Sequence, residues 1–356
     1  MSLLKEETEY ALKLKLYRGV GDVTLHRLLD FYPTFKAAYE SLRPQKDIET
    51  RYQQELENLE KADVYLLSYF DERYPDSLKK IKKSPLLLYV WGNVDALKGD
   101  HIAIVGSRYP STHALLQAEK LAAEYAESGI TVVSGLAKGI DTAAHRGSIK
   151  KKGKTIAVLG SGFLHLTPKD NEKLAEDLRE NGCLLSEFPM DMKATTGTFP
   201  RRNRLISGLS FRGVIMVEGG RKSGSLITAQ YAQDQGRLVY AMPGLASTPN
   251  TSGNHHLLRN GARFLEKASD LEGFESVTTD PSSKELEKKL EIDLNENERY
   301  VFEILDFEPL GIDALHQRAQ TRSFKLSELM SILTLLEMKG FCRNINGYQF
   351  VKSFSN

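Results

Sequence analysis

Cysteine and long apolar runs are both scarce in this chain, and their scarcity excludes several kinds of protein. Its 356 residues include two cysteines, Cys183 and Cys342, which form no CxxC pair and have no metal-ligand spacing. We therefore expect a protein of the reducing cytoplasm, without disulfides and without a metal site. No apolar run approaches the ~18 residues of a transmembrane helix, and the first residues lack the apolar core of a signal peptide. Neither a membrane span nor a targeting segment is expected.

Net charge is also nearly missing from the sequence. The 48 basic and 47 acidic side chains leave a formal charge of +1. This balance excludes a strongly basic protein that attracts polyanions over its whole surface. Any polyanion site must therefore come from local clusters of charge. The position of each arginine thus says more about such a site than the total charge does.

Motifs of three common enzyme classes are absent as well. No G-x-x-x-x-G-K-[ST] is present, which disfavours a P-loop ATPase. Gly160-Ser161-Gly162 follows a predicted strand, but His165 stands where a dinucleotide-binding fingerprint has its last glycine. We therefore expect no cofactor. No G-x-S-x-G nucleophile elbow surrounds any of the serines near predicted strand ends, which are Ser107, Ser134, Ser186 and Ser207.

The order of the apolar patterns divides the chain into three segments and a linker. Residues 1–70 are predicted to form short helices, broken at Gly19-Val20-Gly21. Residues 71–273 alternate short β-rich runs with helical stretches such as His113–Ser128 and Asp141–Lys151. This alternation predicts an α/β fold with a doubly wound, mostly parallel, Rossmann-like sheet. The predicted strands are Leu86–Trp91, Ile102–Val105, Thr131–Ser134, Thr155–Leu159, Cys183–Ser186, Gly213–Val217 and Leu238–Ala241.

The last part of the chain follows a different pattern. Residues 274–292 are polar and charged and are predicted to be a linker. Residues 293–356 contain three helical segments, followed by two short strands on either side of the turn 344–347. Three helices and a hairpin predict a winged-helix domain. The predicted helices are Asn297–Leu305, Ile312–Gln320 and Leu326–Lys339.

Glycine- and serine-rich turns follow five of the predicted strands. In a doubly wound sheet the carboxyl ends of the strands border the ligand crevice, and small residues there let a ligand approach the backbone. The helix N-termini that follow offer free N–H groups and partial positive charge, which suit phosphate. One such turn is usually only a turn, but five in succession, three with Arg or Lys, indicate a phosphate-binding edge. The turns are Gly106–Arg108, Ser134–Asp141, Gly160–Gly162, Glu218–Ser225 and Met242–Gly244.

Three arginines stand together in the stretch FPRRNR, residues 199–204. Burying them together is costly unless anions or carboxylates pair with them. A solvated turn, or pairing with Glu187, Asp191 or Glu218, is one interpretation. Contact with a polyanion is favoured, because the stretch precedes the basic turn at 218–225 and arginine binds phosphate bidentately. The asparagine in the stretch can cap a helix or bond a base edge.

Three further features allow more than one interpretation. Asp141 and His145 lie on one helix face and could form an acid–base pair, although a cap and a packed histidine are favoured. Gly19-Val20-Gly21 fits either a phosphate contact between helices or a simple connection. Aromatic rings near the turns could stack a nucleobase, although core packing is expected for Phe199 and Phe211. The rings are those of Tyr109, Phe163, Phe199 and Phe211.

Seven motifs in a fixed order connect the core to a known family. Their order and spacing match over roughly residues 70–270, and the chain thereby resembles the DprA/Smf family of DNA-processing proteins. Members of this family often carry a SAM-like helical module before the core and a winged-helix module after it. The motifs are IVGSR (104–108), SGLAKGIDTAAHRG (134–147), KTIAVLGSG (154–162), SEFP (186–189), FPRRNRLISGLS (199–210), SGSLITAQYA (223–232) and MPG (242–244).

The resemblance implies a function as well as a fold. DprA-like proteins are bacterial, cytoplasmic homodimers that bind and protect single-stranded DNA without sequence preference. During natural transformation and recombination they load RecA recombinase onto that DNA and displace single-strand binding protein. The partners implied for this chain are therefore single-stranded DNA, RecA, single-strand binding protein and a second copy of itself, and no enzymatic activity is expected.

The family's motifs also imply the residues of the site. Its DNA pocket is basic and lies at the switch region of the sheet. Carried over motif by motif, the DNA-binding residues are Gly106, Ser107, Arg108, Lys138, Lys169, Arg201, Arg202, Asn203, Arg204, Lys222, Ser223, Gly224 and Ser225. The self-association region corresponds to residues 253–265, predicted to be helical, with His255, Leu258 and Phe264 at the dimer interface. The chain departs from the family at Thr167, usually tyrosine, and at residues 111–114, usually S-x-Y-G, and neither change removes a basic residue.

Two other functions fit parts of the sequence. Residues 202–229 resemble nucleotide-processing enzymes of the lysine-decarboxylase-like family, which hydrolyse an N-glycosidic bond. Their motif P-G-G-x-G-T-x-x-E supplies a glutamate for the chemistry, whereas Thr228 stands here and cannot act as a general base without activation. The winged helix suggests a regulator that binds duplex DNA. Its predicted recognition helix, Leu326–Lys339, has only Lys325 and Lys339 as cations, beside Glu328 and Glu337, which is poor for groove binding.

Overall fold

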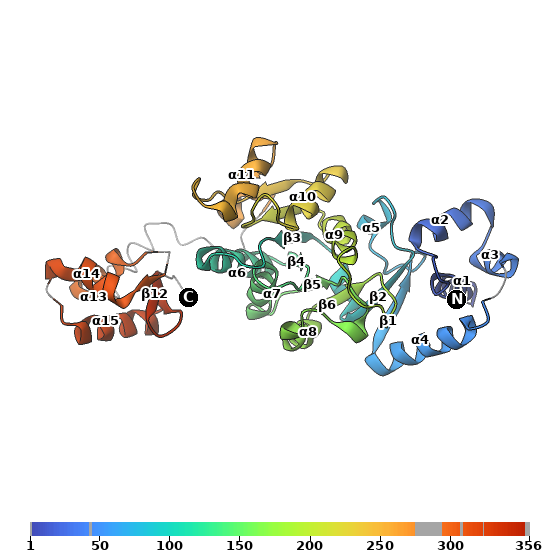
Figure 1. The fold of residues 1–356 in the computed structure, drawn as a ribbon, viewed down its shortest axis with the longest axis horizontal. Coiled ribbons are helices and arrows are strands. Elements are labelled where there is room, and N and C mark those ends of the chain that lie inside the picture. The colour runs from blue at the N-terminus through green and yellow to red at the C-terminus, as the bar shows by residue number, and fades with distance from the viewer. Residues whose placement is uncertain (1, 43–44, 275–293, 307–308, 323, 353–356) are drawn as a thin grey trace. The chain divides into compact units, whose positions relative to one another are not determined.

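The computed structural model describes residues 2–42, 45–274, 294–306, 309–322 and 324–352. The chain divides into two units, Met1–Glu275 and Ser276–Asn356, which are described separately (Figure 1). The predicted linker falls outside the described residues from residue 275 onward. The boundaries expected at residues 70, 273 and 292 stay predictions.

Nine strands form a single sheet in the first unit, in the order β1-β2-β6-β5-β4-β3-β7-β8-β9. Every neighbouring pair from β6 to β9 is parallel, whereas β1 and β2 pair in antiparallel fashion at one edge. All seven strands predicted from the sequence are present, with ends that differ by one residue at most. The strands are β1 Val64–Ser68, β2 Leu87–Gly92, β3 His101–Val105, β4 Thr131–Ser134, β5 Thr155–Val158, β6 Cys183–Ser186, β7 Gly213–Met216, β8 Val239–Ala241 and β9 Arg263–Phe264.

The winding of the sheet reverses at β3. From β3 the chain adds β4, β5 and β6 on one side, and it then returns to place β7 and β8 on the other side. Strand β3 therefore pairs in parallel with both β4 and β7. The ligand crevice of a doubly wound sheet lies beyond the carboxyl ends of the strands at such a switch point. The predicted fold class is confirmed, and the topology directs attention to the turns after β3, β4 and β7.

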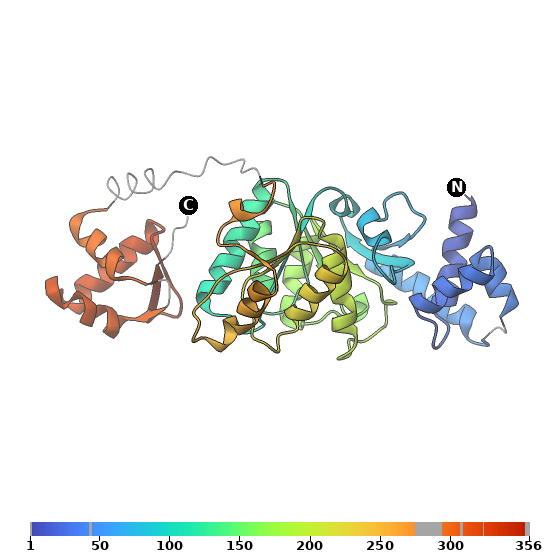
Figure 2. The same ribbon diagram turned by 90° about the horizontal axis from the view of Figure 1, so that it is seen from above.

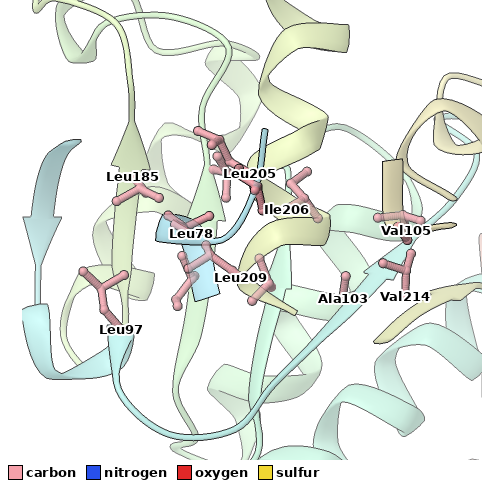
Figure 3. Packing of buried hydrophobic residues seen from close by; sticks show 14 of the residues in the cluster. Leu78, Leu97, Ala103, Val105, Leu185, Leu205, Ile206, Leu209 and Val214 are labelled. Atoms are coloured by element: carbon pink, nitrogen blue, oxygen red, sulfur yellow. The ribbon is translucent and has the colours of Figure 1, made fainter. Parts of the chain in front are cut away.

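Alternate residues of β3 face two separate cores. Ile102 and Ile104 pack in one core with α6 and α7, and Ala103 and Val105 pack in the other, which Figure 3 shows from close by. Both faces of the strand are therefore covered, which explains the unbroken apolar runs in the sequence. Figure 1 shows α6 and α7 on one face of the sheet and α9 and α10 on the other. The helices of this unit are α1 Ser2–Lys15, α2 Asp22–Phe31, α3 Phe35–Ser41, α4 Ile48–Ala62, α5 Asp76–Lys79, α6 Thr112–Glu127, α7 Ile140–Lys150, α8 Glu172–Arg179, α9 Thr198–Leu209, α10 Ser225–Asp234 and α11 Ser252–Arg259.

The N-terminal segment is not helical throughout, and the prediction for residues 1–70 is wrong at its end. Helices α1 to α4 are followed by strand β1, which pairs with β2 at the edge of the sheet (Figures 1 and 2). Helix α4 ends where Asp63 takes the left-handed conformation, with φ of 54°, and this reverses the chain into the strand. The sequence pattern does not predict this strand, because its pairing depends on β2, which lies further along the chain.

The segment expected to be helical over residues 253–265 is corrected as well. Helix α11 ends at Arg259, and the chain turns at Gly261, whose φ of 88° suits glycine. Residues Arg263 and Phe264 then form strand β9, which pairs with β8. The far end of the sheet is thus an edge strand of two residues.

The second unit confirms the winged-helix prediction. Helices α13 Glu296–Ile304, α14 Ile312–Arg318 and α15 Leu326–Met338 enclose one apolar core. Strands β11 Cys342–Asn344 and β12 Gln349–Lys352 form the predicted hairpin. A third strand, β10 Leu310–Gly311, which the sequence did not reveal, pairs with β12. Across both units, the helices of the described residues include none long and apolar enough to cross a membrane.

Candidate nucleic-acid interface

Backbone hydrogen bonds hold the turns after β3, β4 and β7 together. The amide of Ser107 donates to the carbonyl of Glu218 over 2.6 Å, and the amide of Ile140 donates to the carbonyl of Ser107 over 3.2 Å. Gly139 has φ of 81°, and a Cβ at this position would lie 2.3 Å from the Ser107 oxygen. Only glycine permits so close an approach. Gly139 therefore allows the turn that carries Lys138 to lie directly against the turn that carries Arg108.

Four of the predicted DNA-binding cations point into solvent around these turns. Arg108 is exposed, and its guanidinium lies 5.5 Å from the centre of the Phe199 ring. Lys138 is also exposed and forms an ion pair with Asp170, which raises the pKa of the lysine. Lys169 and Lys222 are exposed on the neighbouring loops. These side chains give the carboxyl edge of the sheet a basic rim that the overall charge of the chain does not reveal.

The stretch FPRRNR lies in the first turns of helix α9, so its arginines point to different sides. Arg202 is 4% exposed, and its guanidinium donates to the carbonyls of Gly135 and Val158 at the ends of β4 and β5. Burial lowers the pKa of Arg202 to about 10. These contacts give Arg202 a structural role in fixing the strand ends, and a direct DNA contact by this residue stays a prediction.

The other two arginines belong to an ion network that reaches the N-terminal helices. Glu187 is fully buried and accepts from Arg204 and, over 3.1 Å, from Arg201. Arg201 also donates to Asp22 over 2.8 Å, and Asp22 binds Lys15 over the same distance. The pairing with Glu187 that the sequence allowed is therefore present. Asp191 and Glu218, the other carboxylates considered, have different partners among the described residues.

The turn after β7 is joined to helix α9 and opens into helix α10. The side-chain amide of Asn203 donates to the carbonyl of Gly224 over 3.3 Å. The hydroxyls of Ser223 and Ser225 lie 2.6 Å apart at the start of α10. Lys222, Ser223, Gly224 and Ser225 thus stand at a helix N-terminus next to the switch point, where N–H groups face an anion favourably.

Two acidic groups of this edge, Asp141 and Glu218, hold the fold together. Asp141 is buried and accepts from the amides of Gly135 and Ala137, over 3.1 and 3.3 Å. Burial raises its pKa. Glu218 accepts from the amide and the hydroxyl of Ser111, over 2.9 and 2.6 Å, and so fixes the start of helix α6. Both carboxylates are therefore engaged in hydrogen bonds that hold the turns.

His145 does not face Asp141 as a catalytic pair would. Its Nδ1 lies 2.7 Å from the Thr155 hydroxyl, which itself donates to the carbonyl of Val132, so the histidine donates. Burial and the nearby charge of Arg202 lower the pKa of His145 to about 3. The interpretation of Asp141 and His145 as a turn-binding carboxylate and a packed histidine is the one that the contacts support.

Two residues of this edge were missed by the sequence reasoning. Asn254 is fully buried, and its amide donates to the carbonyls of Met216, Val217 and Met242. It also accepts from the amide of Gly219, so one side chain ties the ends of β7 and β8 together. A lone asparagine gives no signal of this in a sequence. Arg221 is exposed beside Lys222 and could have been included from that adjacency.

The three residues expected at a dimer interface differ in their exposure. Phe264 is 54% exposed on the edge strand β9. Leu258 is half-buried against the core, and His255 is half-buried with its Nε2 3.0 Å from the Gly244 carbonyl. Phe264 is thus the most exposed of the three. The described residues include no cluster of three or more side chains that could hold a metal ion.

Fold and edge together define a Rossmann-like α/β protein with a basic, glycine-rich rim at its switch point and a winged helix at its C-terminal end. Comparison with known families agrees with this class. The model described as DNA recombination-mediator protein A matches residues 65–274, and that of the DprA winged helix domain matches residues 285–347. The chain belongs to the DNA recombination-mediator protein A (DprA/Smf) family.

Individual relatives agree with the family assignment. DNA processing protein DprA of Bacillus subtilis is 44% identical over 201 residues, which cover 56% of this chain and 67% of the relative. Protein Smf of Escherichia coli is 40% identical over 60% of this chain and 57% of its own length, so the match spans little more than half of that relative. The X-ray structure of DprA from Streptococcus pneumoniae superposes with a TM-score of 0.65 at 35% identity, over 75% of this chain and 98% of that one.

A second solved structure concerns the single-stranded DNA binding mode of DNA processing protein A from Helicobacter pylori. It matches this chain with a TM-score of 0.53 at 29% identity. The match covers 58% of this chain and 93% of the Helicobacter pylori chain.

Proposed function

We propose that this protein binds single-stranded DNA without sequence preference at the carboxyl edge of its sheet. The observation that carries the proposal is the cluster of exposed Arg108, Lys138 and Lys222 on three turns that are bonded to one another. Binding that ignores sequence needs cations and backbone amides for phosphate, and little else. The relationship to a Helicobacter pylori protein studied for its single-stranded DNA binding supports the same function.

The buried carboxylates of the same edge are poorly suited to act as a general acid or base. Asp141, Glu187 and Glu218 are each buried and bonded to amides, arginines or a serine, so none is free to move a proton. Thr228, at the place of the glutamate in lysine-decarboxylase-like enzymes, is buried in helix α10. A general base needs a titratable group within reach of the substrate. We infer that the protein binds and presents DNA and is not an enzyme.

A titration followed by fluorescence anisotropy tests the proposal. A labelled single-stranded oligonucleotide and the duplex of the same sequence are compared over a series of salt concentrations. The wild-type protein is expected to favour the single strand and to lose affinity steeply with salt. Arg108→Ala and Lys138→Ala are each expected to weaken binding and to lower the salt slope by about 0.7, the contribution of one phosphate contact on a single strand.

Lys98→Ala is the matched control for Lys138→Ala. Both lysines are exposed, and each is paired with an aspartate of its own. Lys98 precedes β3 and therefore lies at the amino ends of the parallel strands, away from the proposed site. Its substitution is expected to leave binding unchanged. Equal binding of single strand and duplex, or equal effects of the two lysine substitutions, would exclude this edge as the DNA site.

We propose further that the protein acts in the cytoplasm as a homodimer that loads RecA onto DNA covered by single-strand binding protein. Support comes from the family assignment. The measurement is the rate at which RecA forms filaments on such DNA, with and without the protein. A faster rate that Arg108→Ala abolishes is expected, whereas an unchanged rate in the presence of bound protein would contradict the loading role.

A further inference from the structure

Tyr109 follows Arg108 directly, and its side chain is 83% exposed. No other large hydrophobic side chain of the described residues is as exposed. One exposed ring needs no explanation by itself. The position of Tyr109 is what matters, because it stands just beyond the carboxyl end of β3 and directly follows Arg108 of the proposed DNA site.

The backbone that carries the ring is anchored on both sides. The Tyr109 amide donates to the Ser107 hydroxyl over 3.0 Å, and the Asn250 side chain donates to the Tyr109 carbonyl over 3.4 Å. Two residues later, Ser111 is held by both oxygens of Glu218. A ring on a fixed loop loses little conformational freedom when a ligand stacks on it.

The other aromatic rings considered for stacking are already engaged or lie elsewhere. Phe163 packs against Trp91 with ring centres 6.2 Å apart, and Phe199 lies under the guanidinium of Arg108. Phe211 stands at the amino ends of the parallel strands, because the amide of the next residue donates to the carbonyl of His101 at the start of β3. Among the described residues, Tyr109 alone of the four has neither a ring partner nor a cation over its face.

The residues near Tyr109 are of the kind that bind a nucleotide. Arg108 precedes it, and the close approach of Gly139 to Ser107 and Arg108 brings the turn of Lys138 alongside. The ion pair with Asp170 raises the pKa of Lys138, so this side chain stays a cation at the turn. Phosphates of a strand on these cations would leave a base free to reach the ring.

We propose that Tyr109 stacks one unpaired base of the bound strand and thereby contributes to the choice of single-stranded over duplex DNA. The inference rests on the proposed function. Every base has a π face, so stacking adds affinity without adding sequence preference. A paired base inside a duplex has both faces covered by its neighbours, so the ring gains nothing from duplex DNA.

Substitution of the ring tests the inference in the titration described above. Tyr109→Ala is expected to weaken binding of the single strand about 5- to 150-fold, the range measured for loss of one base–aromatic stack. Binding of the duplex and the salt slope are expected to stay unchanged, because no charge is lost. Tyr109→Phe should bind as the wild type does. Phe211→Ala removes an exposed ring at the opposite edge and should have no effect.

An oligonucleotide of equal length with abasic residues throughout separates stacking from other effects. The wild-type protein should lose more affinity than Tyr109→Ala when the bases are removed. Equal losses for the two proteins, or unchanged binding by Tyr109→Ala, would overturn the stacking role. If Arg108→Ala still weakens binding in that case, the proposed DNA site stands without the stack. If Arg108→Ala binds normally, the site and the stack both fail.

Discussion

Arg201 on helix α9 donates a hydrogen bond of 2.8 Å to Asp22 at the start of helix α2, across 179 residues of sequence. The same aspartate binds Lys15, and the same arginine binds Glu187. Removing one member of a buried network leaves a charge unpaired, which costs roughly 3–5 kcal/mol. The N-terminal helices and the helix that bears the arginine cluster are therefore stabilised by one set of ion pairs.

Acid is expected to remove the contribution of Asp22. Burial, the largest influence on its pKa, acts upward, but Lys15 and Arg201 together outweigh it and lower the pKa from 3.8 to about 2. A carboxyl with a lowered pKa stabilises the fold above its unfolded pKa and loses that effect as the pH falls towards the folded value. The difference in unfolding free energy between wild type and Asp22→Asn should therefore shrink by about 1 kcal/mol between pH ~6 and pH ~3.

Urea denaturation at several pH values measures this difference. Asp170→Asn serves as the control, because Asp170 and its partner Lys138 are both exposed side chains. Its substitution should have little effect on stability at any pH. A difference for Asp22→Asn that is as large at pH ~3 as at pH ~6 would contradict the role given to its charge.

Gly139→Ala is expected to disrupt the contact between the turns after β3 and β4. The added Cβ would lie 2.3 Å from the Ser107 oxygen, so one turn must move, and the residue also has φ of 81°. We expect a loss of unfolding free energy of about 2–4 kcal/mol and weaker binding of single-stranded DNA. Gly129→Ala is the control, since Gly129 has φ of 76° with no atom near its Cβ position. Equal losses for both variants would mean that backbone strain, and not the contact, is responsible.

Arg202→Met distinguishes a structural arginine from one that touches DNA. The guanidinium donates to the Gly135 and Val158 carbonyls inside the protein, so its loss should cost about 2–4 kcal/mol of stability. The salt slope of DNA binding by the folded variant should equal that of the wild type, because no phosphate contact is lost. Arg221→Met, at an exposed arginine, should be nearly neutral for stability. A normal stability combined with a lower salt slope would show instead that Arg202 contacts DNA.

Phe264→Asp tests the proposed dimer. Phe264 is exposed on the two-residue edge strand β9, and a charge there would oppose burial against a second copy. Analytical ultracentrifugation should show a dimeric wild type and a largely monomeric variant. Phe211→Asp, at an exposed ring on a different part of the sheet, should stay dimeric. A monomeric wild type, or a dimeric Phe264→Asp, would argue against this edge as the interface.

Much of the fold could be predicted from the sequence, and the exceptions share a cause. Strands such as Thr131–Ser134 and Cys183–Ser186 were predicted with their observed ends, because both faces of each are buried and the apolar run records this directly. Strands β1, β9 and β10 were missed. Each lies at an edge of its sheet and is defined by a distant partner more than by its own residues.

The candidate site divides in the same way. The sequence determined which turns are rich in glycine and which carry cations, because backbone freedom and side-chain charge are properties of single residues. Only the tertiary structure decided that Arg202 faces the interior, that Arg201 and Arg204 meet Glu187, and that Arg108 and Lys138 face solvent. Burial and pairing depend on residues far apart along the chain, so adjacent arginines with equal sequence signals can have opposite roles.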